Sequence, residues 1–154
     1  MRRLLPLLVL VVACGKKPVN VTAIEWVGTV ETAEARAKAE HKPVVVFIGA
    51  EWDTGTKELE HVSFADADVR ALAQRYVTLR LDGTDDENEA FRKNADRFKV
   101  VGIPTMIIFA SDLRTELYRI NEYTPPEKLA GILMYADKPG VGLGGMQARA
   151  SYEG

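Results

Sequence analysis

Residues 43–60 read PVVVFIGAEWDTGTKELE, and this stretch decides the fold. Val44 to Ile48 is an unbroken apolar run of strand length, which is typical of a central strand covered on both faces. A short polar segment follows, and Lys57 to His61 then has a helical pattern. A buried strand that leads into a helix is the repeating unit of α/β proteins.

The rest of the chain continues this alternation. Thr84-Asp85-Asp86-Glu87 has the pattern of a capping box, and Thr124-Pro125-Pro126-Glu127 places Thr124 as N-cap, Pro at N1 and Glu at N3. The order predicts an α/β fold, with a central mixed sheet and helices on both faces. Strands are expected over 21–26, 44–48, 77–81, 105–109 and 116–120, and helices over 32–41, 57–61, 66–75, 84–98 and 124–135.

Three separated motifs identify a family resemblance. The first motif is Ala50-Glu51-Trp52 followed by Lys57, Glu58 and Glu60. The second is residues 63–69, SFADADV, and the third is residues 101–105, VGIPT. In this order they resemble thioredoxin-like proteins, in particular the C-terminal periplasmic domain of the DsbD thiol:disulfide interchange family. The resemblance covers about residues 20 to 135 and implies a thioredoxin-like fold.

The residues that carry the family's chemistry are changed. Its W-C-x-x-C motif uses one thiolate as nucleophile and a second cysteine to resolve the mixed disulfide. Asp53 and Thr56 occupy those two positions here, and Phe47 occupies the position of a buried acid that assists proton transfer. We therefore predict no catalytic residue and no cofactor, and a redox-inactive binding or adaptor module.

Two enzymatic alternatives remain beside this prediction. Family similarity by itself suggests thiol–disulfide exchange or cytochrome maturation. Residues 53–56 also read DTGT, the signature of aspartic proteases, and Val100-Val101-Gly102 imitates the second element of that family. Such proteases need an all-β fold and two carboxylates that share a proton.

The resemblance also implies a binding groove. In the family, the W-x-x-x segment and a loop with a cis proline form this groove, where an extended peptide pairs with the residue before the proline. The expected partner is an extended peptide segment or an envelope protein. The alternative is that Asp53 only caps a helix and Pro104 is retained for folding. The predicted groove residues are Trp52, Asp53, Thr54, Gly55, Thr56, Ile103, Pro104 and Thr105.

The N-terminal residues are typical of a secretory signal. Arg2 and Arg3 precede nine residues from Leu4 to Val12 that are apolar apart from one proline, too short for the ~20 that span a bilayer. The following Ala13-Cys14 resembles a bacterial lipobox, which implies lipidation of Cys14. The alternative is an ordinary signal peptide with an incidental cysteine.

These features predict a domain organisation and a location. The expected parts are a signal peptide (1–14), a tether (15–20), a thioredoxin-like domain (21–136) and a flexible glycine-rich tail (137–154). We expect a periplasm-facing protein held in a bacterial membrane by lipid on Cys14. Gly15 after that cysteine slightly favours the outer membrane.

Composition excludes several other classes. The 154 residues include 20 basic and 22 acidic side chains, without a basic patch for nucleic acid. A single cysteine excludes an internal disulfide, a CxxC redox pair and a multi-cysteine zinc site. No metal site is therefore predicted.

Overall fold

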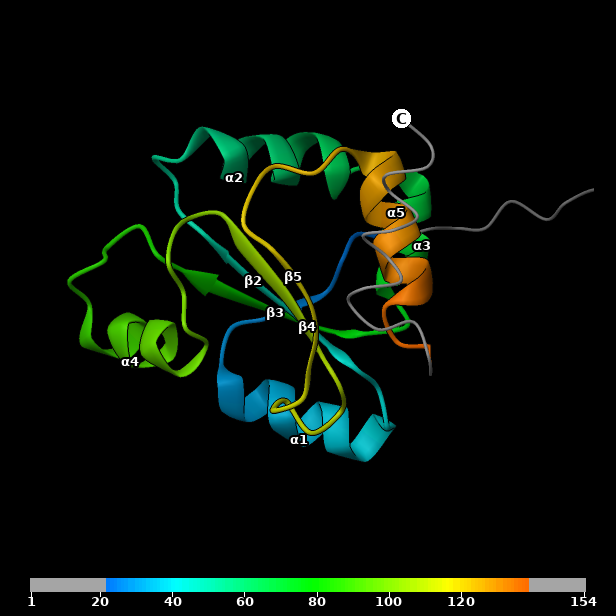
Figure 1. Ribbon diagram of the computed structural model, residues 1–154, viewed down its shortest axis with the longest axis horizontal. Coiled ribbons are helices and arrows are strands. Elements are labelled where there is room, and N and C mark those ends of the chain that lie inside the picture. The colour runs from blue at the N-terminus through cyan, green and yellow to red at the C-terminus, as the bar shows by residue number, and fades with distance from the viewer. Residues whose placement is uncertain (1–21, 139–154) are drawn as a thin grey trace, which may run out of the picture.

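The predicted α/β fold is confirmed by the computed structural model, which describes residues 22–138 (Figure 1). Its five-stranded mixed sheet has the strand order β1-β3-β2-β4-β5. Several predictions concern residues outside this range: the signal peptide, Cys14, the tether, and all but the start of the tail. The strands are β1 (Trp26–Val27), β2 (Val44–Gly49), β3 (Val77–Asp82), β4 (Thr105–Phe109) and β5 (Glu116–Ile120). The helices are α1 (Val30–Glu40), α2 (Thr54–Glu58), the π-helix η1 (Leu59–Ser63), α3 (Ala67–Ala73), α4 (Glu89–Arg97) and α5 (Pro126–Tyr135).

Strand β2 is the centre of the molecule. It is parallel to β3 and antiparallel to β4, and all six of its residues are buried. Its side chains alternate between two hydrophobic cores, with Val46 in the core beneath α1 and Phe47 in the core beneath α3 and α5. The unbroken apolar run therefore serves both faces of the sheet.

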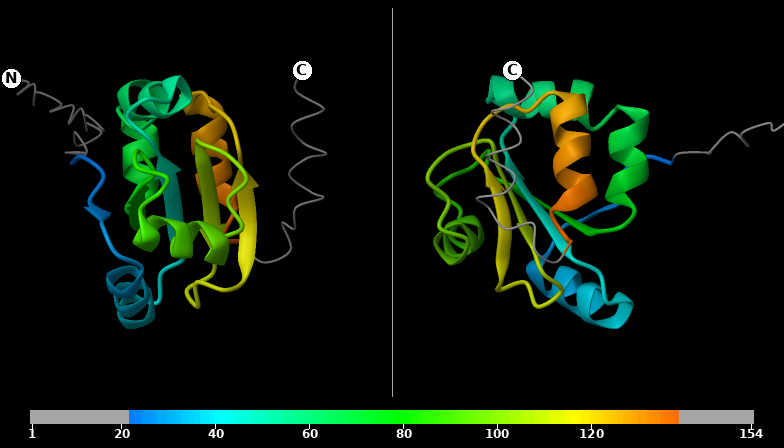
Figure 2. Two further views of the ribbon diagram at one scale, coloured as in Figure 1. Left: turned by 90° about the vertical axis from the view of Figure 1, so that its left-hand side faces the viewer. Right: turned by 45° about the vertical axis from the view of Figure 1, so that its right-hand side comes forward.

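The helices form two layers around this sheet. The right-hand view of Figure 2 separates the adjacent α3 and α5 from α1, with the sheet between them. Buried alanines of α1 pack on one face, and buried Leu129 and Leu133 of α5 pack on the other. This arrangement places the segment after β2, which carries residues 50–56, at the carboxyl end of the central strand.

Two predicted N-caps are wrong. Helix α4 begins at Glu89, and Asn88 is its cap. Thr84 does not cap it, because the N–H and the hydroxyl of Thr84 both donate to Oδ1 of Asp82, at 3.1 and 2.6 Å. Helix α5 has Pro125 at its N-cap position and no side-chain cap, because the hydroxyl of the buried Thr124 donates to the carbonyl of Glu122 at 3.5 Å.

Other boundaries also differ from the prediction. Helix α1 begins at Val30 because Thr29 caps it, and α2 begins at Thr54 because Asp53 caps it. Strand β1 has only two residues. The carbonyl of Glu25 just before it accepts from the Thr78 hydroxyl at 2.6 Å.

Candidate functional site

Asp53 caps the helix that follows the central strand. Its backbone is extended, and its Oδ2 accepts a hydrogen bond from the N–H of Thr56 at 2.6 Å. A carboxylate at this place satisfies a free N–H of the first turn and suits the positive end of the helix. The family's nucleophile position is thus occupied by a structural oxygen.

Thr56 lies beneath the site rather than on its surface. Only 1% of the residue is exposed, and its Oγ1 accepts a hydrogen bond from the N–H of Ala50 at 3.2 Å. A Cβ added at Gly49 would come within 2.7 Å of the Thr56 methyl group, so these residues pack tightly. The hydroxyl ties the beginning of the site loop to its helix.

The turn before β4 closes against this loop. The Ile103–Pro104 peptide bond is cis, and a Cβ added at Gly55 would lie 3.0 Å from Cδ of Pro104. Pro104 and Thr105 are buried, whereas Ile103 is partly exposed. The Thr105 hydroxyl donates to the carbonyl of Gly102 at 2.6 Å, which holds the turn together.

Trp52 dominates the exposed surface of the site. It is 59% exposed, and its indole Nε1 donates to the carbonyl of Thr84 at 3.1 Å. The Thr84 hydroxyl accepts from the N–H of Glu51 at 3.0 Å, and Asp82 fixes Thr84 in turn. This role of Thr84 was not predicted from the sequence, because nothing in the local pattern connects residues 33 positions apart.

The predicted groove residues therefore divide into a surface and a base. Thr56, Pro104 and Thr105 are buried and form the base. At least partly exposed are Trp52, Asp53, Thr54, Gly55 and Ile103. Val101, which was not predicted, is 86% exposed just before the cis-proline turn and enlarges the apolar surface.

Phe47 fills the position of the family's buried acid with an aromatic cluster. It is fully buried, and its ring centroid lies 5.8 Å from that of Trp26 and 5.0 Å from that of Phe64. This position has no side-chain group that accepts a proton. The arrangement is built for packing, not for proton transfer.

The aspartic-protease alternative is wrong. Residues 53–56 enter a helix of an α/β protein, whereas that chemistry needs an all-β fold with a shared-proton carboxylate pair. Within residues 22–138, no group of three or more His, Cys, Asp or Glu could hold a metal ion. None of the helices described is long and apolar enough to cross a membrane.

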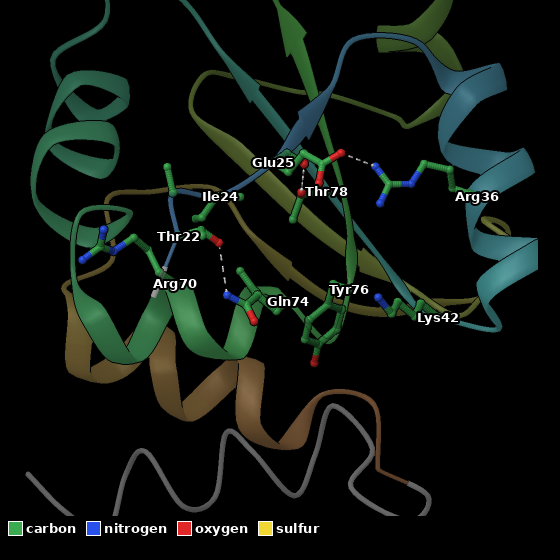
Figure 3. Close-up of a pocket in the computed structure, with 11 residues that line it drawn as sticks. Thr22, Ile24, Glu25, Arg36, Lys42, Arg70, Gln74, Tyr76 and Thr78 are labelled. Atoms are coloured by element: carbon green, nitrogen blue, oxygen red, sulfur yellow. Dashed lines mark hydrogen bonds and ion pairs between the residues drawn. The ribbon is translucent and has the colours of Figure 1, made fainter. Parts of the chain in front are cut away.

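A polar hollow of about 440 Å³ lies away from this site, between the segment before β1, α1 and α3 (Figure 3). Figure 3 shows Arg36 and Lys42 on one side of it and Arg70 on the other. Arg36 pairs with Glu25 and Glu40 at 3.0 Å each, and Lys42 also pairs with Glu40. These pairs neutralise two of its cations. Arg70 forms no ion pair among residues 22–138, and its buried Nε has no hydrogen-bond partner there.

The thioredoxin-like family model matches residues 25–111 of this chain. Among curated proteins, the chain is 31% identical over 130 residues to the thiol:disulfide interchange protein DsbD of Ralstonia nicotianae, and 34% identical over 77 residues to DsbD of Pseudoalteromonas atlantica. The first alignment covers 83% of this chain and 20% of its relative, and the second 49% and 12%. The chain thus spans about a fifth or less of these relatives.

Solved structures with a similar fold include a DsbH oxidoreductase, with a TM-score of 0.67, 14% identity, and coverage of 79% of this chain and 90% of that one. A thioredoxin from Thermus thermophilus gives a TM-score of 0.65, 20% identity, and coverage of 78% and 92%. The oxidised C-terminal domain of DsbD from Neisseria meningitidis gives a TM-score of 0.57 and 20% identity, and the alignment covers 66% of this chain and 87% of that one. At these identities the similarity shows the fold alone.

Proposed function

The chain belongs to the thioredoxin-like family. Within that family, we propose that it is a redox-inactive binding module of the bacterial envelope. The observation that carries this proposal is the pair Asp53 and Thr56. Both positions of the redox motif hold oxygen, one engaged as a helix cap and the other buried against a backbone N–H. Neither can form a disulfide.

The proposed ligand is an extended segment of a partner protein. It would lie along Ile103 and the exposed Trp52, next to the surface of Thr54 and Gly55. Main-chain pairing to an extended segment provides affinity without requiring a reactive group. The indole, fixed by Thr84, offers a large apolar contact that needs little ordering on binding.

The proposed location rests on the sequence. The basic start, the short apolar run and Cys14 support export and a lipid anchor, with the domain facing the periplasm and the outer membrane slightly favoured. Replacing Cys14 with Ser is expected to move the chain from the membrane fraction to the soluble fraction of lysed cells. Retention of the variant in the membrane fraction would contradict the lipid anchor.

Site-specific photocross-linking in the native envelope tests the binding role. A photoreactive residue replaces the exposed Thr54, and the matched control replaces Ser111, which is exposed in the β4–β5 connection at the opposite end of the sheet. We expect one protein to be captured at position 54 and not at position 111. Equal capture at the two positions, or none at 54, would contradict the groove.

The competing function is thiol–disulfide exchange, as in the name of the DsbD relatives. An insulin-reduction assay separates the two functions directly. We expect no turnover above a sample without protein, because neither motif position contains sulfur. Turnover that persists in Cys14→Ser would overturn the redox-inactive assignment.

A further inference from the structure

A cavity of about 460 Å³ adjoins the Trp52 surface. It lies between the end of β3 and the first turns of α4, and Leu81, Asp82, Thr84, Asp85 and Phe91 are among the residues that line it. Thr84 belongs both to this cavity and to the hydrogen bonds that fix Trp52 and Glu51. The cavity therefore begins where the exposed indole is anchored.

One wall of the cavity lies close to the cis-proline turn. A Cβ placed on Gly83 would lie 2.7 Å from Cδ1 of Ile103 and 2.8 Å from Cζ of Phe91. Ile103 and Phe91 thus meet over this glycine, which has no side chain to separate them. Phe91, which lines the cavity, therefore adjoins the apolar side chain of Ile103 in the predicted groove.

Apolar and acidic groups share the lining. Leu81, Ala90 and Phe91 provide apolar surface, whereas Asp82 and Asp85 provide carboxylates, and no lysine or arginine lines the cavity. The hydrogen bond from the Thr84 hydroxyl holds the pKa of Asp82 below its ordinary value, so this carboxylate is charged at neutral pH. Neither carboxylate forms an ion pair within the described part of the chain.

Each carboxylate also has an oxygen left for a ligand. Thr84 donates only to Oδ1 of Asp82, and the N–H of Glu87 donates only to Oδ1 of Asp85. Arg92, the nearest cation in the helix, is already paired with Glu87 at 3.4 Å. Further exposed acidic residues, Glu51 and Asp86, lie beside the same surface in sequence. The charge of Arg80 also lowers the pKa of Asp82, but Arg80 pairs with Glu60. Among residues 22–138 the carboxylates of the cavity therefore have no ion-pair partner, which disfavours an acidic partner.

We propose that this cavity receives a lysine or arginine side chain of the partner segment. The aliphatic part of the side chain packs on Phe91 and Leu81, and its cation binds the free carboxylate oxygens of Asp82 and Asp85. The inference rests on the proposed function, because the same extended segment places an apolar residue against Trp52. The partner is thus a basic and apolar segment, not an acidic one.

Selection from a displayed library of random dodecapeptides on the full chain, purified in detergent, tests this inference. We expect the selected peptides to be enriched in lysine or arginine next to an apolar residue. In the double variant Asp82→Asn/Asp85→Asn, amide oxygens still accept the internal hydrogen bonds, but both charges are removed. A synthetic copy of a selected peptide should bind this variant about tenfold more weakly or worse.

The matched control is the double variant Asp68→Asn/Glu127→Gln, which removes two exposed carboxylates from α3 and α5 on the other face of the sheet. It should bind the peptide as the wild type does. Selected peptides without basic residues, or unchanged binding to Asp82→Asn/Asp85→Asn, would overturn this inference and leave the groove intact. Failure to select any peptide, together with no capture at position 54, would overturn both proposals.

Discussion

At the residue scale, the degenerate motif is a set of structural contacts rather than an empty active site. Asp53 accepts from the N–H of Thr56, and Thr56 accepts from the N–H of Ala50. The first bond satisfies a free N–H in the first turn of α2, and the second satisfies the N–H of Ala50, directly after β2. Oxygen performs this role where sulfur, a weaker acceptor, would perform it less well.

The cap at position 53 gives the first stability prediction. Replacing Asp53 with Ala should lower the free energy of unfolding by about 1 kcal/mol, because the Thr56 N–H loses its acceptor. Asn at this position keeps an acceptor oxygen and should cost less than Ala. Urea unfolding of the three proteins measures the difference. Equal stability of wild type and Asp53→Ala would show that the carboxylate does not serve as a cap.

The buried hydroxyl gives a second prediction. Thr56→Val keeps the shape of the side chain but leaves the Ala50 N–H unpaired, which should cost about 1–3 kcal/mol of unfolding free energy. Thr56→Ser is the control, because it keeps the hydroxyl and its hydrogen bond and removes only the methyl group. Chemical denaturation compares the two variants. A valine variant as stable as wild type would contradict the bonded role of this hydroxyl.

At the element scale, the site depends on loops that follow two different strands. The segment after β2 carries Trp52, and the segment after β3 carries Thr84, which fixes both Glu51 and the indole. Parallel pairing of β2 and β3 brings these two segments to one edge of the sheet. The binding surface is thus a property of strand pairing.

The β4–β5 connection supplies a pH-dependent element. Backbone N–H groups of Thr115 and Arg114, with the Thr115 hydroxyl, lower the pKa of Asp112 to about 2 from 3.8. Because the folded-state pKa is depressed, this carboxylate stabilises the fold above about pH 4 and loses that effect as pH falls toward 2. Asp112→Asn should therefore show a shallower loss of stability over this range. Unfolding of both proteins from pH 5 to pH 2 tests this, and parallel curves would contradict it.

Helix α5 contains a position that can be improved. Gly131 lies inside the helix, and an added Cβ there would meet nothing within 4 Å. Gly131→Ala should stabilise the protein by about 0.5–1 kcal/mol, because alanine restricts the unfolded chain and favours the helix. Thermal or urea unfolding measures the gain. Gly49→Ala is the contrasting variant, since its Cβ would lie 2.7 Å from the Thr56 methyl group, and it should destabilise the protein.

At the scale of the whole molecule, the chain has the scaffold of its family, but other residues stand at the positions of the redox motif. The family match, the strand order and the cis Ile103–Pro104 turn describe the scaffold. Side-chain oxygens at positions 53 and 56, and the aromatic cluster around Phe47, stand where the family carries its two cysteines and its buried acid. A fold of this kind hosts many functions, so the function depends on the site surface.

Restoring the cysteines tests how much of the reaction the scaffold still supports. Asp53→Cys with Thr56→Cys, on a Cys14→Ser background, places two thiols three positions apart in the first turn of α2, within reach of a disulfide. We expect both thiols to be lost on mild oxidation in a thiol titration. Insulin reduction should remain slow, because Phe47 leaves no proton acceptor at the position of the buried acid. If two titratable thiols persist in the folded protein after oxidation, positions 53 and 56 do not correspond to the two cysteines of the family motif.

The sequence by itself predicted the element order and the burial of β2 on both faces, and it shows that neither position 53 nor position 56 carries sulfur. These follow from local periodicity and from residue type, which do not depend on how distant segments meet. Its errors at Thr84 and Thr124 have one cause. A capping pattern gives the residue types of a helix start. In the structure, however, the Thr84 hydroxyl donates to Asp82 and the Thr124 hydroxyl donates to the carbonyl of Glu122, so neither caps its helix.

Only the tertiary structure decided what the surface of the site is. It buried Thr56, Pro104 and Thr105, fixed Trp52 through Thr84, and placed a carboxylate-lined cavity beside them. These features join residues from the ends of β2 and β3, the start of α4 and the turn before β4. Hydrogen bonds and packing between such distant segments form only when the sheet has assembled, so the local sequence pattern does not contain them.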